Sequence, residues 1–131
     1  PVQRMLSRYH HYVRASGTGE AQLPPGLSLE GFCRLPRFQD TYAKYLWRFP
    51  VERFDFIGLT ECFDASLADF SRRYGIDCRA PRALNANPAR EEPRYDVTPA
   101  VERMILAANA ADAAIYDQAR RRFGWPGTRN P

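Results

Sequence analysis

The sequence predicts an α/β fold that is rich in helices. Residues 54–60 (Phe-Asp-Phe-Ile-Gly-Leu-Thr) form a short apolar run, which is typical of a strand buried in a parallel sheet. A helical pattern follows this run directly, and a strand followed by a helix indicates α/β construction. The same patterns identify about four helices but no second strand, so the predicted strand lacks a neighbour for its backbone N–H and C=O groups. We therefore expect the other strands to come from a missing N-terminal segment or from a partner chain.

Length and composition are those of one domain of ordinary size. The chain has 131 residues, of which 44% are hydrophobic and 13% aromatic, and this excludes a disordered, collagen-like or coiled-coil protein. The formal net charge is +4, and arginine supplies all but one of the 19 basic residues. Arginine suits phosphate, sulfate and carboxylate partners. The basic residues are scattered among 15 acidic ones, which argues against nucleic acid as a partner, and no apolar run approaches the ~20 residues of a membrane span.

The first part of the chain is predicted to begin with a helix. Residues 1–14 place apolar side chains at helical spacing. Residues rich in glycine and proline then predict a long loop over 15–27. A short helix is expected near 28–35, beginning at Ser28, and the aromatic-rich segment 38–47 is either a second short helix or an irregular packed segment.

The second part is predicted to hold two longer helices. After the predicted strand, Asp64 is expected to cap a helix that ends at Gly75. Residues 76–97 contain three prolines and predict a second long loop, and loops of this length are usually functional or disordered. Thr98, followed by a proline, opens the last and longest helix, which is expected to run as one element to Gly124.

Asp112 lies in the apolar stripe of this last helix. A carboxylate on an apolar face needs a partner, and we expect that partner to be an arginine or the backbone terminus of a helix rather than a substrate.

The cysteines carry no recognisable chemistry. Cys33, Cys62 and Cys78 form no CxxC pair and have no metal-ligand spacing, so no metal site is expected. We expect Cys33 and Cys62 to be small core residues. A sparse, odd set of cysteines is typical of a reducing compartment, and a single disulfide remains an alternative.

Four segments, taken together, resemble one protein family. Residues 1–9 read Pro-Val-x-Arg-x-x-Ser-x-Tyr, which is similar to the segment after the central strand of PAPS-dependent sulfotransferases. Residues 56–61 (Phe-Ile-Gly-Leu-Thr-Glu) resemble a strand of the heparan and dermatan sulfate 2-O-sulfotransferases and their bacterial relatives. Residues 84–87 (Leu-Asn-Ala-Asn) resemble the family's late cofactor loop, and residues 112–123 its closing helix.

The resemblance implies a fold and a chemistry. The family has a P-loop-like α/β fold and moves a sulfuryl group from PAPS (3′-phosphoadenosine 5′-phosphosulfate) to a hydroxyl group of an acceptor, here expected to be a carbohydrate. On this basis residues 1–131 are a single partial domain, the helix-rich C-terminal portion of that fold without its N-terminal strands and phosphosulfate loop. We expect these residues alone to transfer no sulfate. The alanine- and arginine-rich composition favours a bacterial, cytoplasmic protein.

The resemblance also supplies candidate residues for cofactor binding. The family's serine that holds the 3′-phosphate of PAPS corresponds to Ser7, and a hydroxyl beside an arginine on one helical face makes a compact anion clamp. Arg4 matches the same motif and is either a cofactor ligand or one half of a structural ion pair. Asn85, Asn87 and Arg90 correspond to the late cofactor loop, with Arg90 as a candidate phosphate contact.

No catalytic residue can be assigned. His10 and His11 are the two histidines, and a general-base role for either competes with an exposed or packing role. Thr60 and Glu61 are expected to close the predicted strand and start the next helix. As an alternative to the enzyme, the chain is a complete anion-binding or protein-interaction module that docks a partner or a polyanionic sugar through its arginines and the aromatic segment 38–54.

Overall fold

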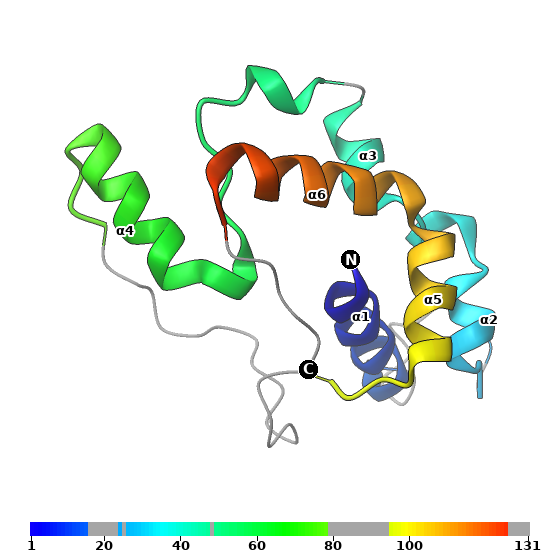
Figure 1. Ribbon diagram of the computed structural model, residues 1–131. Helices are drawn as coiled ribbons and strands as arrows, with labels where there is room; N and C mark the ends of the chain where they lie inside the picture. Colours follow the sequence, from blue (N-terminus) through cyan, green and yellow to red (C-terminus); the bar gives the residue numbers. More distant parts are fainter. Residues whose placement is uncertain (16–23, 25, 48, 79–94, 126–131) are drawn as a thin grey trace. The chain divides into compact units, whose positions relative to one another are not determined.

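The computed structural model describes residues 1–15, 24, 26–47, 49–78 and 95–125 (Figure 1). These residues form helices and irregular segments, and none of them forms a β-strand. The chain divides into two compact units, which comprise Pro1–Arg48 with Glu91–Ala114 and Phe49–Arg90 with Ile115–Pro131.

The predicted α/β fold, as the C-terminal portion of a P-loop-like sulfotransferase fold, is therefore wrong for the described residues. Residues 54–60 do not form the expected strand. Side chains, rather than a neighbouring strand, bond backbone groups of this run: the Leu59 N–H donates to Ser66 Oγ at 3.1 Å, and the Ile57 carbonyl accepts from Trp125 Nε1 at 2.8 Å. A buried strand and a buried irregular segment can have the same short apolar sequence pattern, so the pattern alone does not distinguish them.

The first unit is a small helical assembly. Its elements are α1 (Val2–Ala15), α2 (Leu29–Cys33), the 3₁₀ helix η1 (Pro36–Phe38), α3 (Thr41–Leu46), α5 (Pro99–Ala108) and the start of α6 (Ala110–Phe123). The core lies where α1, α2 and α5 meet, and its buried residues are Met5, Leu6, Phe32, Cys33, Phe38 and Ile105. The rings of Phe32 and Phe38 stack with their centroids 4.2 Å apart, so the aromatic segment contributes directly to this core.

Several predicted helix ends are confirmed. The Ser28 hydroxyl accepts a hydrogen bond from the Gly31 N–H, and Thr98 does the same for Val101 at the start of α5. Gly75 ends α4 (Phe63–Tyr74) with a φ of 67°, the left-handed conformation that favours glycine.

Two details of the helix prediction are wrong. The last helix is not continuous, because α5 ends at Ala108 and α6 begins at Ala110. Asn109 between them is fully buried, with φ −133° and ψ 44°. In addition, α4 begins after Cys62, so Asp64 lies within its first turn and not at its cap.

The second unit contains the 3₁₀ helices η2 (Val51–Arg53) and η3 (Thr60–Cys62), α4 and the rest of α6. Its apolar contacts centre on the ring of Phe56, which meets the rings of Phe70, Phe123 and Trp125 at centroid distances of 5.3, 5.8 and 6.1 Å. Arg122 Nη1 donates to the Val51 carbonyl at 2.9 Å and joins α6 to η2.

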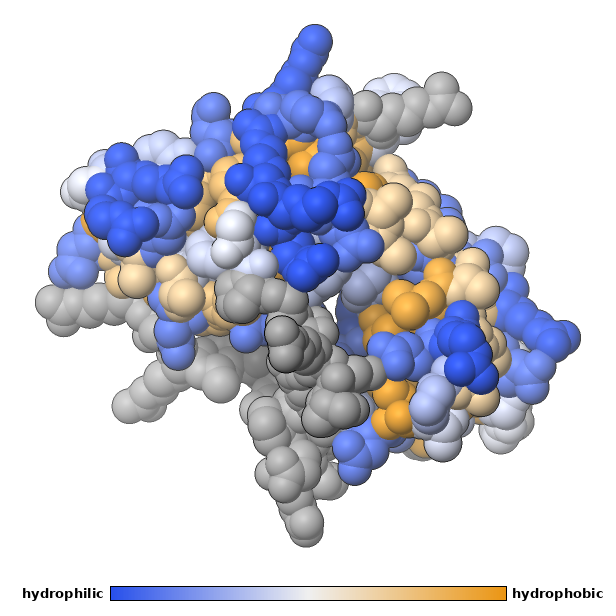
Figure 2. All heavy atoms as spheres, viewed as in Figure 1, coloured by the Kyte–Doolittle hydropathy of each residue, from blue (hydrophilic) through white to orange (hydrophobic). Residues whose placement is uncertain are grey.

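Apolar side chains also reach the surface. Figure 2 shows hydrophobic as well as hydrophilic residues on the face in view. Among the described residues the most exposed large ones are Trp47 at 88% and Tyr45 at 77%. No helix among the described residues has the length and apolar character needed to cross a membrane.

Candidate functional site

The N-terminal helix α1 carries two of the candidate cofactor residues, Arg4 and Ser7. Helix α1 has arginines at positions 4, 8 and 14 and contains no acidic residue, whereas α4, α5 and α6 each include at least one. Ser7 is exposed on this helix. A hydroxyl on a helix without acidic neighbours is a suitable place for an anion, because nothing on the same helix repels a negative charge.

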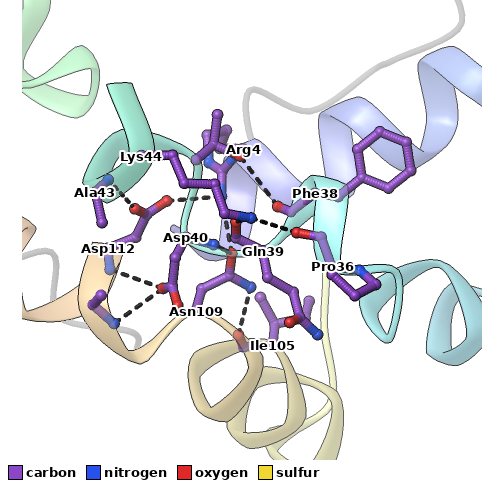
Figure 3. A network of polar contacts seen from close by, with 12 residues as sticks. Arg4, Pro36, Phe38, Gln39, Asp40, Ala43, Lys44, Ile105, Asn109 and Asp112 are labelled. Carbon is purple, nitrogen blue, oxygen red and sulfur yellow. Dashed lines mark hydrogen bonds and ion pairs between the residues drawn. The ribbon is translucent and has the colours of Figure 1, made fainter. Parts of the chain in front are cut away.

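Arg4 is tied into a polar network of the first unit (Figure 3). Its Nη2 lies 2.9 Å from Asp112 Oδ2 and donates to Asn109 Oδ1 at 3.0 Å. The side chain of Asp112 is completely buried and that of Arg4 is 18% exposed, so this ion pair is largely shielded from water. Its electrostatic attraction is correspondingly stronger than that of a surface pair.

The two other nitrogens of the Arg4 guanidinium, Nε and Nη1, are buried and donate to no partner among the described residues. The Arg4 Cζ atom lies 5.3 Å from the centroid of the Tyr42 ring, within the range of a cation–π contact. Of the two roles predicted for Arg4, the structure therefore shows the ion pair. Contact of Arg4 with the cofactor stays a prediction.

Asp112 and Asp40 exchange hydrogen bonds between the start of α3 and the start of α6 (Figure 3). Asp112 Oδ1 accepts from the Ala43 N–H in the first turn of α3 at 2.9 Å. In return, Asp40 Oδ1 accepts from the N–H groups of Ala111 and Asp112 in the first turn of α6, at 3.0 and 3.1 Å. Each carboxylate thus satisfies N–H groups that the other helix leaves without an intrahelical partner.

This exchange confirms the expectation for Asp112 in both of its forms, since the carboxylate contacts an arginine and a helix start. Sequence reasoning missed Asp40. An aspartate directly before a helix is a recognisable cap signal. That signal predicts hydrogen bonds to the helix that directly follows the aspartate, here α3. Asp40 instead bonds to α6, some 70 residues further along the chain.

Asn109 completes the network at the break between α5 and α6. Its Oδ1 accepts from Arg4 Nη2 and from the Asp40 N–H, and its Nδ2 donates to the Ile105 carbonyl at 2.9 Å. The Asn109 side chain is fully buried, so these three bonds satisfy its polar atoms at the point where α5 ends.

The two histidines have different surroundings. The His10 ring stacks on that of Tyr95, with centroids 4.7 Å apart and an interplanar angle of 12°. His11 is exposed and meets the edge of Tyr12. These are the packing and exposed roles that compete with a general-base role for His10 and His11.

The remaining candidates are three residues of the predicted cofactor loop and two residues after the predicted strand. Asn85, Asn87 and Arg90 lie outside the described residues. Thr60 and Glu61 form the 3₁₀ helix that precedes α4 in the second unit, as expected of a helix start, although no strand precedes them.

The cysteines that the structure describes are free thiols, and none of them is arranged for metal binding or nucleophilic chemistry. Cys33, Cys62 and Cys78 are free thiols, and burial raises the pKa of the Cys33 thiol, which makes it a poor nucleophile. Cys33 is buried as predicted, whereas Cys62 is only half-buried. In the part of the chain that the structure describes, no group of histidine, cysteine and acidic side chains is arranged to hold a metal ion.

Comparison of the chain with protein-family models, with curated protein sequences and with solved structures gives no match.

Proposed function

We propose that this chain binds the 3′-phosphate of PAPS through Ser7 and so contributes to a sulfotransferase that transfers a sulfuryl group to a hydroxyl, on a carbohydrate acceptor. The observation that carries the proposal is the exposure of Ser7 on α1, a helix with three arginines and no acidic residue. The resemblance of residues 1–9 to the family motif suggests which anion binds, the 3′-phosphate of PAPS. The positive charge of α1 favours the binding of an anion.

Arg4 lies one helical turn before Ser7 but is already paired. Its Nη2 is held by Asp112 and Asn109. Because the buried carboxylate of Asp112 compensates the Arg4 charge, Arg4 adds little net attraction for a phosphate at Ser7, and its contact with the cofactor stays a prediction.

The test is binding of adenosine 3′,5′-bisphosphate (PAP), which carries the 3′-phosphate but no transferable sulfate. We predict that Ser7→Ala weakens PAP binding by roughly 1–3 kcal/mol, the scale of a hydrogen bond to a charged group. Isothermal titration calorimetry measures the change.

Ser71→Ala is the matched control, because Ser71 is also a helical serine but lies on α4 and bonds the Cys78 N–H. It should leave the affinity for PAP unchanged. Equal affinities of the wild type and the Ser7→Ala variant would remove Ser7 from the site, and the absence of any PAP binding by the wild type would refute the proposed function.

A second candidate is the non-enzymatic interaction module, favoured by the exposed aromatic residues of α3. Tyr42, Tyr45 and the following Trp47 expose 49, 77 and 88% of their surfaces. Binding of a sulfated polysaccharide that is lost in Trp47→Ala, together with no response to PAP, would favour this function over the enzyme.

A further inference from the structure

One face of α1 carries Gln3, Ser7 and His10. These residues are spaced i, i+4 and i+7, which places them in a row along a helix with Ser7 in the middle. Both outer residues contact Tyr95, which lies three positions before Thr98 and the start of α5.

Gln3 bonds both backbone groups of Tyr95. Its Nε2 donates to the Tyr95 carbonyl at 2.9 Å, and its Oε1 accepts from the Tyr95 N–H at 2.8 Å. This is the pair of bonds that a residue of a neighbouring β-strand would make. To make both bonds, one side chain must carry a donor and an acceptor. An amide carries both, whereas a carboxylate carries only acceptors.

His10 holds the same residue from the other end of the row. Its ring lies parallel to the Tyr95 ring, with centroids 4.7 Å apart. Tyr95 is therefore contacted by one residue a helical turn before Ser7, Gln3, and by one residue a turn after it, His10. We call Gln3, His10 and Tyr95 the Tyr95 latch.

Ser7 itself is left open by these contacts. It is exposed, and its hydroxyl has no hydrogen-bond partner among the residues that the structure describes. Backbone N–H and C=O groups that approach a helix compete for nearby hydroxyls. Because Gln3 satisfies both groups of Tyr95, the Ser7 hydroxyl has no need to do so.

We propose that Gln3 is a positioning residue of the Ser7 site: it holds the Tyr95 backbone beside α1 so that the Ser7 hydroxyl stays free to donate to a phosphate oxygen. This proposal rests on the proposed function of Ser7. It adds a residue that the family motif leaves variable, and it assigns the latch a role in binding rather than in packing alone.

Gln3→Met tests the role, because it keeps the length and the neutral charge of the side chain but removes both the donor and the acceptor. We expect PAP binding to weaken about 3- to 10-fold, the effect of one net hydrogen bond. In a Ser7→Ala background the same substitution should cause no further loss, since the hydroxyl that it positions is gone. A purely structural effect would weaken binding by the same factor in both backgrounds.

Gln39→Met is the matched control. Gln39 also donates from Nε2 to a backbone carbonyl, that of Cys33 at 2.8 Å, and it lies in the same unit but away from the Ser7 row. Its change should leave the affinity for PAP unaltered, and equal losses in the two variants would overturn the proposal.

Two results separate this proposal from the proposed function. If the wild type binds PAP and Ser7→Ala weakens binding while Gln3→Met does not, the positioning role is wrong and the proposed function stands. If the wild type binds no PAP, both fall, and hydrogen exchange of the Tyr95 amide then shows only whether Gln3 protects that group.

Discussion

Asp112 connects three parts of the first unit through one carboxylate. It pairs with Arg4 on α1, accepts from the start of α3 and lies in the first turn of α6. The sequence indicated the partner types, because a carboxylate in an apolar stripe must be satisfied. It could not indicate Asp40, because the bonds of Asp40 to α6 depend on how the helices meet.

We predict that Asp112→Ala lowers the free energy of unfolding by about 3–5 kcal/mol, because it leaves the Arg4 charge and the Ala43 N–H buried without their acceptor. Urea unfolding followed by circular dichroism measures the loss. Asp117→Ala, further along α6, is the control: its carboxylate is 53% exposed and 3.8 Å from Arg120 Nε. That substitution should cost less than about 0.5 kcal/mol, and similar losses in the two variants would contradict the importance of the buried network.

At the scale of the element, helix starts and stops were predicted best. Ser28, Thr98 and Gly75 act at helix ends as expected, because capping depends on residues within one turn. The break at Asn109 was missed. Its bonds to Arg4 and Asp40 come from distant parts of the chain, and nothing in the local pattern announces them.

Helix α3 is flanked by two non-glycine residues in the left-handed conformation, Asp40 at φ 44° and Trp47 at φ 43°. Asp40 bonds to α6 in this conformation, and aspartate tolerates it. Trp47 is bulky and 88% exposed, so little packing offsets its strain.

We therefore predict that Trp47→Gly raises the free energy of unfolding by about 1 kcal/mol, because glycine adopts positive φ without steric cost. Thermal unfolding provides the measurement. Gly75→Ala introduces a Cβ at φ 67° where no atom lies within 4 Å, so it should lose a comparable amount through backbone strain alone. A destabilised Trp47→Gly variant would instead mean that the indole ring packs against the protein.

For the whole molecule, the fold class was the least predictable property. The prediction of a sheet rested on residues 54–60, and a run of that length and polarity is compatible with either a strand or an irregular segment. The structure resolves the ambiguity through Ser66 and Trp125, whose side chains bond this run. Such contacts are set by tertiary packing and leave no periodic trace in the sequence.

The buried thiol of Cys33 contributes to the pH dependence of global stability. Burial raises its pKa in the folded protein, so the unfolded chain loses this proton first as the pH rises. The free energy of unfolding should then fall above the ordinary thiol pKa of about 8.5, by less than about 1.4 kcal/mol per pH unit. Urea unfolding at neutral and alkaline pH should show this slope reduced in Cys33→Ala but retained in Cys78→Ala, and an equal slope in all three proteins would contradict the assignment.

Asp40 and Asp112 accept hydrogen bonds from each other's helices, and Asn109 links Asp40 to Arg4. The four residues Arg4, Asp40, Asn109 and Asp112 therefore depend on one another. A mutation at Arg4 or Asp112 leaves the other charge without its partner, and a mutation at Asp40 or Asn109 removes hydrogen bonds that join α6 to the rest of the unit. Intermediates with a single change are thus at a disadvantage, so these four positions should vary together or not at all as related sequences diverge. Anyone redesigning the first unit would need to replace all four at once.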